Sequence, residues 1–179
     1  TVTFSGGGLL AAMTRSVAIG AANVKLDVNA DDIATLSGGQ DRDWLLAGAS
    51  GKVIDGAGGS DMVSFVDAPA RVVVDLAAGS ASVGDQHWTL RNIEEATGTQ
   101  FGDQIGGSAG TNLLRGLGGA DWLTGSGGGD TFDGGGGRDT VSYSAATAGV
   151  STGLSAGGTA GQATGDRYTA VENLTGSSF

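Results

Sequence analysis

A nine-residue repeat is the feature that most constrains how this chain can fold. From Gly98 onward the sequence divides into five consecutive copies without an insertion: GTQFGDQIG, GSAGTNLLR, GLGGADWLT, GSGGGDTFD and GGGGRDTVS. The sixth position of each copy is an acid or its amide: Asp103, Asn112, Asp121, Asp130 and Asp139. The eighth position is always apolar: Ile105, Leu114, Leu123, Phe132 and Val141. Because the register holds throughout, one structural unit is expected to repeat along this part of the chain.

A poorer block of the same repeat begins at Gly38, as GGQDRDWLL, AGASGKVID and GAGGSDMVS, with Asp43, Lys52 and Asp61 in sixth position. A longer repeat of 78 residues relates the two blocks, since Glu94, for example, recurs as Glu172. We divide the chain into an N-terminal strand or cap segment (1–37), a short degenerate block (38–64), a β connector (65–97), a main block (98–142) and a second connector that begins a further repeat (143–179). We expect this chain to be a piece of a longer tandem array.

Each copy joins a glycine-rich turn to a minimal strand. Six residues rich in glycine form a tight turn, because glycine adopts positive φ at little cost. The next three residues form a short strand whose apolar middle residue faces inward. Two copies make one flattened turn of the chain, and stacked turns pair their strands in parallel sheets around a ladder of apolar side chains. The repeat therefore predicts an all-β fold, a parallel β-solenoid with stranded connectors.

Stacking would also align the sixth-position side chains. Asp103, Asp121 and Asp139 fall on one edge of the stack, and Asn112 and Asp130 fall on the other. Successive turns lie ~4.8 Å apart, and two carboxylates at ~5 Å repel each other by ~3 kcal/mol at an effective dielectric of about 20. A cation between the loops would offset this repulsion. Oxygen ligands favour a hard ion, and calcium suits best because it binds ~6–8 oxygens, backbone carbonyls included.

The composition excludes several other classes of protein. Glycine supplies 36 of 179 residues beside a single Pro, which excludes collagen and disfavours a helical bundle. The chain has no Cys, which excludes disulfide scaffolds and thiolate metal sites. A net charge of −10 repels nucleic acid and anionic membranes. We therefore expect no nucleic-acid binding. No apolar run approaches the ~20 residues of a spanning helix, so we also expect no membrane insertion.

The copies match the pattern GGxGxDxUx, in which U is apolar, and the chain resembles the RTX family of haemolysin-type calcium-binding nonapeptide repeats. Val141-Ser142-Tyr143 and the stretch 171–176 also resemble segments that join RTX blocks in secreted bacterial proteins. The resemblance implies a Ca²⁺-bound parallel β-roll, export by type I secretion and folding in extracellular calcium. It implies as ligands the sixth-position side chains and carbonyls of the glycine-rich turns: Asp43, Asp61, Asp103, Asn112, Asp121, Asp130, Asp139, Gly116, Gly118, Gly134 and Gly136.

The expected sites join successive turns of the stack: Asp121 with Asp139, Asp103 with Asp121, Asn112 with Asp130, and Asp43 with Asp61. Lys52 stands where an acid belongs, and its charge repels a cation. That edge of the first block is therefore expected to hold no ion. Asn112 is neutral and is expected to weaken its site, whereas the Asp121–Asp139 site is expected to be the strongest.

Catalytic interpretations have less support. Residues 106–110 fit GxSxG, but they lie within the nonapeptide register, and His87 is the one possible base. Glu94 and Glu95 resemble a catalytic carboxylate pair, but a strand end explains them better. We expect a non-catalytic segment of a larger secreted protein, with calcium ions, neighbouring repeats of the parent chain or cell-surface components as partners. Two alternatives stay open: a repeat unit of a cell-surface adhesin, or an accessory module of a secreted protease, lipase, peroxidase or polysaccharide epimerase.

Overall fold

The computed structural model describes residues 25–26, 35–48 and 51–179. Most of the strand or cap segment predicted over 1–37 lies outside the described residues. Within it the structure describes β1 (Lys25–Leu26) and β2 (Thr35–Ser37). The described chain is all-β, as predicted, with one short 3-10 helix, η1 (Gly161–Ala163). None of its helical segments has the length and apolar character needed to cross a membrane.

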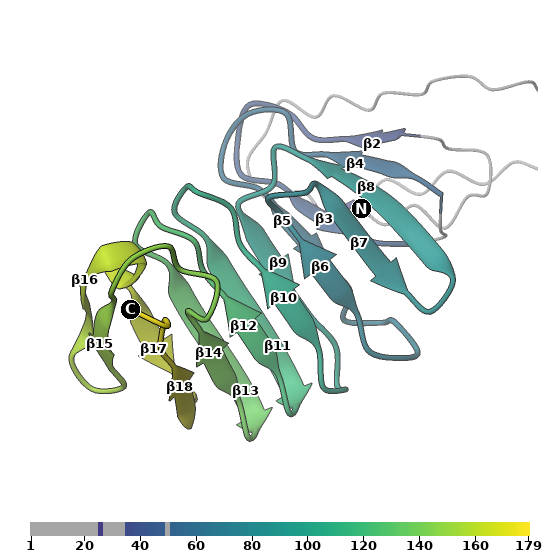
Figure 1. The fold of residues 1–179 in the computed structure, drawn as a ribbon. Coiled ribbons are helices and arrows are strands. Elements are labelled where there is room, and N and C mark those ends of the chain that lie inside the picture. Colours follow the sequence, from purple (N-terminus) through teal and green to yellow (C-terminus); the bar gives the residue numbers. More distant parts are fainter. Residues whose placement is uncertain (1–24, 27–34, 49–50) are drawn as a thin grey trace, which may run out of the picture.

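Two sheets run side by side along the described chain (Figure 1). The first sheet contains, in spatial order, β1, β3 (Trp44–Leu46), β5 (Met62–Ser64), β9 (Glu95–Thr97), β11 (Leu113–Gly119), β13 (Thr131–Gly137) and β17 (Arg167–Thr169). The second contains β18 (Asn173–Thr175), β14 (Thr140–Ser142), β12 (Trp122–Thr124), β10 (Gln104–Gly106), β6 (Val73–Asp75), β7 (Ser80–Val83), β8 (Gln86–Arg91), β4 (Val53–Asp55) and β2. A separate pair is formed by β15 (Ser151–Gly153) and β16 (Gly157–Ala160).

Successive nonapeptides place their strands in the two sheets alternately. The strand of each copy begins directly after the sixth position, so β10 follows Asp103 and β12 follows Asp121. Strands two copies apart are parallel neighbours, with Ile105 opposite Leu123 and Leu123 opposite Val141. This parallel register is the one that the repeat predicts within the blocks.

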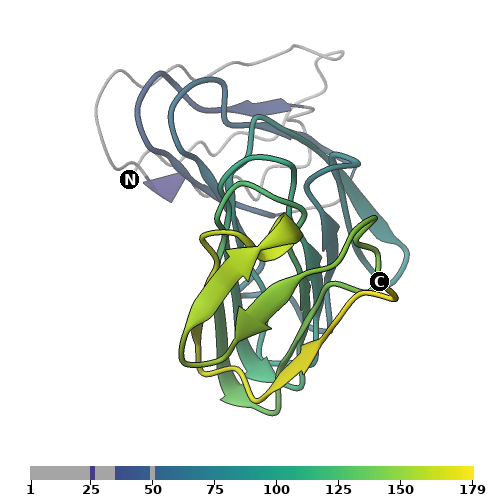
Figure 2. The same ribbon diagram turned by 60° about the vertical axis from the view of Figure 1, so that its left-hand side comes forward.

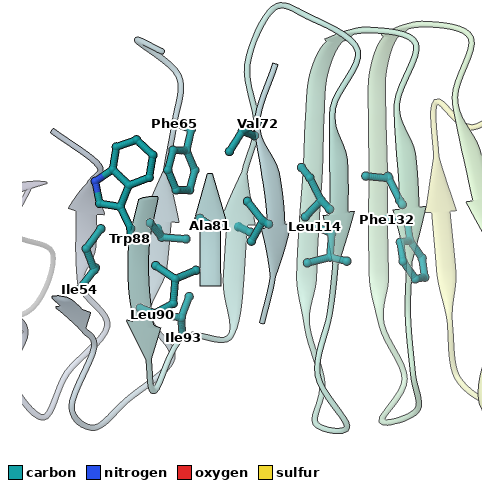
Figure 3. Packing of buried hydrophobic residues seen from close by; sticks show 14 of the residues in the cluster. Ile54, Phe65, Val72, Ala81, Trp88, Leu90, Ile93, Leu114 and Phe132 are labelled. Atoms are coloured by element: carbon teal, nitrogen blue, oxygen red, sulfur yellow. The ribbon is translucent and has the colours of Figure 1, made fainter. Parts of the chain in front are cut away.

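The eighth-position side chains fill the space between the sheets. All eight are almost fully buried: Leu45, Ile54, Val63, Ile105, Leu114, Leu123, Phe132 and Val141. Figure 3 shows the two sheets contributing to one continuous cluster, with Leu114 and Phe132 at one end and Ile54 and Trp88 at the other. Burial of this apolar ladder stabilises the fold by about 25 cal/mol per Å² of apolar surface removed from water.

The connectors depart from an all-parallel arrangement. In the first connector, β7 pairs antiparallel with both β6 and β8, which inserts a hairpin into the second sheet. In the second connector, β15 and β16 form the equivalent antiparallel pair. Beside β6, Val72 and Val74 are buried, whereas Val73 between them is exposed. The second sheet is therefore mixed, whereas every described pairing in the first sheet is parallel.

The 78-residue repeat exchanges the two sheets. Val63 lies in β5 of the first sheet, and its counterpart Val141 lies in β14 of the second. Likewise β8 pairs with β4 as β17 pairs with β13, with Thr89 opposite Val53 and Arg167 opposite Thr131. Viewed along the stack, the two sheets enclose one shared interior (Figure 2). Equivalent residues of the two 78-residue units therefore occupy corresponding positions in opposite sheets.

Candidate metal centre

Buried polar side chains form two columns, and each column lies where the strands of one sheet begin. Each member directly precedes a strand, and all seven of the sixth-position ligands expected from the sequence are buried: Asp43, Asp61, Asp103, Asn112, Asp121, Asp130 and Asp139. Within a column, each carboxylate side chain that follows another member accepts a hydrogen bond from the backbone amide of the member one turn earlier. The strand pairing fixes this spacing, because both residues lie at the same level of adjacent parallel strands.

The column beside the second sheet links three aspartates and a glutamate. The amide of Asp103 donates to Asp121 Oδ1 at 2.7 Å, and the amide of Asp121 donates to Asp139 Oδ1 at 2.8 Å. The amide of Asp139 then donates to Glu172 Oε2 at 2.8 Å. At the other end, Asp103 Oδ1 accepts from the amide of Val72 at 2.8 Å. The second connector therefore ends this column with a carboxylate.

The column beside the first sheet passes through both blocks. The amide of Asp43 donates to Asp61 Oδ1 at 2.8 Å, and the amide of Asp61 donates to Glu94 Oε2 at 2.9 Å. Asn112 Nδ2 donates to the Glu94 carbonyl at 3.0 Å, which joins the blocks. The amide of Asn112 donates to Asp130 Oδ1 at 2.9 Å. All four pairs expected from the sequence are therefore neighbours in the structure.

Four carboxylate oxygens in these columns are buried and accept no hydrogen bond from the described residues. They are Oδ2 of Asp61, Asp121, Asp130 and Asp139. A buried acceptor without a partner costs about 1–3 kcal/mol, and more when it is charged. By contrast, Oδ2 of Asp43 accepts from the amide of Gly39, and Oδ2 of Asp103 accepts from the amide of Thr99, both at 2.6 Å. The unpartnered oxygens are therefore the ones that a cation would satisfy.

Glycine at the first position of a copy makes room for these oxygens. A Cβ built on Gly116 would lie 1.9 Å from Asp121 Oδ2 and 2.6 Å from the carbonyl of Gly134. A Cβ on Gly134 would lie 2.5 Å from Asp139 Oδ2. The carboxylate oxygen and a carbonyl oxygen of the next turn therefore face the same point. Any side chain at these glycines would fill that space.

The other two expected glycine ligands lie elsewhere in the turn. Gly118 faces the side chain of Gln100, and the nearest atom to a Cβ on Gly136 is the carbonyl of Leu117 at 3.8 Å. Both belong to the extended ends of β11 and β13, where Gly118 is opposite Gly136. The structure brings Gly116 and Gly134 to the carboxylates, and it gives no such contact for Gly118 or Gly136.

Burial shifts the titration of the column carboxylates. Loss of solvation raises the pKa of Asp61 and of Asp121 to about 6, and raises the pKa of Asp130 to about 7. Neighbouring acids add to the shift: Asp43 and Glu94 beside Asp61, and Asp166 beside Asp130. Loss of solvation also raises the pKa of Asp103 and Asp139. A bound cation would favour the charged form of each group and oppose these shifts.

The donor set suits calcium. It consists of carboxylate and carbonyl oxygens, which are the ligands that this hard cation prefers. Within the described residues no three acidic, His or Cys side chains converge on one point. Each candidate site would therefore combine a pair of carboxylates with backbone carbonyls of the turns, as the crowding at Gly116 indicates.

Lys52 occupies a different column from Asp43 and Asp61. It is buried directly before β4, and its carbonyl accepts from the amide of Thr89, so Trp88 is its neighbour in the stack. Their counterparts 78 residues later are Asp130 and Asp166, and the carbonyl of Asp130 accepts from the amide of Arg167 in the same way. At this edge the first unit therefore has a lysine and a tryptophan, and the second unit has two aspartates.

Sequence reasoning missed three column members, Glu94, Asp166 and Glu172. They lie in the connectors, outside the nonapeptide pattern, and their separation from the preceding member is 33 or 36 residues instead of 18. The signal that could identify them was the recurrence of Glu94 as Glu172 in the 78-residue repeat. Asp166 Oδ1 accepts from the amide of Asp130 at 2.7 Å, while its Oδ2 accepts from the hydroxyl of Tyr143.

The residues weighed for catalysis have other partners. Glu94 and Glu95 diverge, since Glu94 faces Asp61 whereas Glu95 Oε2 forms an ion pair with Arg42 at 2.6 Å. Ser108 of the GxSxG stretch donates its amide to Asn112 Oδ1 at 2.6 Å within a nonapeptide turn. His87 is exposed in β8, next to the buried Trp88.

Comparison with known proteins agrees with this geometry. The family model of the RTX calcium-binding nonapeptide repeat matches in four copies, over residues 30–63 and 106–141. These two segments contain Asp43, Asp61, Asn112 and Asp130 of the first-sheet column and Asp121 and Asp139 of the second-sheet column. A search of curated proteins found no match. The matched segments belong to the family of RTX calcium-binding nonapeptide repeats.

Proposed function

We propose that calcium ions bind between successive members of the two columns and that this binding drives the chain to fold as a parallel β-roll. The observation that carries the proposal is the set of four buried Oδ2 atoms without a hydrogen-bond partner among the described residues. Asp121 and Asp139 supply two of these atoms, with the carbonyl of Gly134 between their turns. This site is the strongest of the expected set, because both of its side chains have an unpartnered Oδ2, whereas only one side chain does in each of the other three pairs.

Binding and folding are one equilibrium in this proposal. The column carboxylates come together only when the turns stack, so the unfolded chain offers no comparable site. A ligand that binds only the folded state stabilises it by RT ln(1 + [L]/Kd), about 2.7 kcal/mol at a concentration of 100 Kd. Without the ion, the buried like charges oppose stacking. Calcium therefore acts as a structural component of the fold.

The setting we propose is outside a bacterial cell. A chain that folds only when calcium is abundant stays unfolded where free calcium is scarce, and an unfolded chain can pass through a type I secretion channel. The match to the RTX family supports this part of the proposal. The segment then serves as a non-catalytic, structural part of a larger secreted protein.

A count of bound ions tests the proposal. Equilibrium dialysis of the whole chain against calcium is compared with a D121N/D139N variant, in which both amide oxygens still accept the column hydrogen bonds. The matched control is D67N/D85N, which removes two charges from exposed positions. We expect the control to bind as many ions as the original chain and the column variant to bind fewer. Equal binding by all three proteins, or no binding by the original chain, would overturn the proposal.

A further inference from the structure

The two connector glutamates stand where a column changes from nonapeptide to connector. We propose that the connectors complete two additional calcium sites, one formed by Asp61, the Asn92 carbonyl and Glu94, the other by Asp139, the Ala170 carbonyl and Glu172. This inference rests on the proposed function. It assigns calcium ligands to residues outside the repeat pattern, and it makes the connectors part of the metal-binding apparatus.

The first connector site is built around an unsatisfied oxygen. Asp61 is fully buried, and its Oδ2 accepts no hydrogen bond from the described residues. Its amide donates to Glu94 Oε2 at 2.9 Å, which holds the second carboxylate beside it. A Cβ built on Gly56 would lie 2.5 Å from Asp61 Oδ2 and 2.1 Å from the carbonyl oxygen of Asn92. These two oxygens are therefore closer together than the ~5 Å that spans a calcium coordination shell.

The second connector site repeats this arrangement. Asp139 is fully buried, its Oδ2 has no partner among the described residues, and its amide donates to Glu172 Oε2 at 2.8 Å. A Cβ on Gly134 would lie 2.5 Å from Asp139 Oδ2 and 2.1 Å from the Ala170 carbonyl. The two sites lie on opposite sheets and 78 residues apart. The agreement of these contacts in the two units indicates that the arrangement is a property of the repeat.

The connector carbonyls take the place of a nonapeptide carbonyl. Between Asp43 and Asp61, the oxygen that faces Asp43 Oδ2 belongs to Gly56, the first residue of the copy that contains Asp61. Between Asp61 and Glu94, that role passes to Asn92, two residues before the carboxylate. Asn92 and its counterpart Ala170 both adopt left-handed backbone conformations, with φ of 49° and 50°. This shorter turn delivers a carbonyl and a carboxylate together, as the longer glycine-rich turn does.

Glutamate suits the connector for a steric reason. Glu94 follows a turn three residues shorter than the nonapeptide turn, and its extra methylene extends the carboxylate toward the preceding aspartate. Asn92 and Glu94 also help to line a cleft of about 190 Å³ on the outer side of this site. Calcium commonly keeps water among its oxygen ligands. Glu94 lies 33 residues after Asp61, whereas Asp61 lies 18 residues after Asp43. A search of the sequence for partners at the nonapeptide spacing of 18 residues therefore does not find Glu94.

Substitution by glutamine separates metal binding from hydrogen bonding. In E94Q/E172Q each side chain keeps an oxygen that can accept from the aspartate amide, so a role limited to that hydrogen bond is preserved. The experiment measures calcium stoichiometry of the whole chain by equilibrium dialysis, together with its far-ultraviolet circular dichroism. D85N/D67N is the control for loss of charge, since both residues are exposed.

We expect E94Q/E172Q to bind two ions fewer than the control, and each single variant to bind one fewer, with the β signal kept at saturating calcium. Unchanged stoichiometry and affinity in E94Q/E172Q would overturn the inference while leaving the proposed function intact. If the double variant stays unfolded in saturating calcium, the single variants carry the same test, because each retains one connector site. Failure of the original chain to bind calcium would instead overturn the proposed function itself.

Discussion

The hydroxyl of Tyr143 donates a hydrogen bond to Oδ2 of Asp166, and both side chains are buried. The same two positions one unit earlier hold Phe65 and Trp88, whose rings pack edge to face with centroids 5.3 Å apart. An apolar pair in the first unit is thus a hydrogen-bonded pair in the second. Asp166 therefore joins the column beside the first sheet through its Oδ1, while the Tyr143 hydroxyl satisfies its Oδ2.

Replacing one residue of either pair by its counterpart from the other unit should therefore destabilise the fold. Y143F would leave Asp166 Oδ2 buried without its donor, which costs about 1–3 kcal/mol. F65Y would bury a hydroxyl against Trp88, which stands in place of Asp166 and offers no oxygen to accept a hydrogen bond, and should also destabilise. Urea unfolding in saturating calcium measures both free energies of unfolding. Variants as stable as the original chain would contradict the account of this pair.

A single methyl group at the first position of a copy should disrupt a calcium site. G116A places a Cβ 1.9 Å from Asp121 Oδ2, so the carboxylate must move. We expect at least a tenfold loss of calcium affinity at that site, equivalent to about 1.4 kcal/mol. G127A is the matched control, because no atom lies within 4 Å of the new methyl group. Calcium titration of both variants is the measurement, and equal affinities would count against the site.

Stability without calcium should fall as the pH rises. Folding raises the pKa of Asp61 and Asp121 from 3.8 to about 6, and that of Asp130 to about 7. Between pH 4 and 7 the folded state therefore holds more protons than the unfolded state, so deprotonation destabilises it. This contribution is complete below about pH 4 and is lost as the pH passes through 6 to 7.

Calcium should reverse that dependence. Its ligands must be deprotonated, so affinity should increase over the same interval. Thermal unfolding of the calcium-free chain at pH 4.5 and pH 8 tests the first trend, and the same scans with saturating calcium test the second. A calcium-free chain that gains stability with rising pH would contradict the assignment of the buried carboxylates.

Replacing Asn112 by aspartate should have opposite effects with and without the ion. A second charge beside Asp130 strengthens the attraction for calcium at that site. The same change removes the donor that Asn112 Nδ2 offers to the Glu94 carbonyl at 3.0 Å, and buries another carboxylate. N112D should therefore bind calcium more tightly at pH 7.5 but unfold more readily in its absence. Isothermal calorimetry and calcium-free urea unfolding distinguish the two effects, and a change of the same sign in both would refute the explanation.

Much of the stacked arrangement could be predicted from the repeat. The eighth-position residues, such as Leu123 and Phe132, are the core side chains because a three-residue strand has one inward position. The pairing of Asp121 with Asp139 follows from two copies per turn, and the structure places these residues in adjacent turns. Local periodicity was sufficient for these features.

The connectors could not be predicted in the same way. Strands β6, β7 and β8 form an antiparallel meander, and its place in the sheet depends on which strand the returning chain pairs with. A short sequence repeat does not determine that pairing. Glu94 looked like an ordinary strand end, because its role appears only when β9 is set beside β5. The position of Asp166 in a column was hidden for the same reason. These contacts depend on pairing between strands far apart in the sequence, which a local sequence pattern does not reveal.

The most direct test of the central claim is a calcium titration of the whole chain, first treated with EDTA, followed by far-ultraviolet circular dichroism, with magnesium as the control ion. We expect a cooperative gain of β signal with calcium but not with magnesium, and a weaker gain or none in D121A/D139A. A chain whose β signal is the same in EDTA and in calcium, and which retains no calcium by metal analysis, would contradict it.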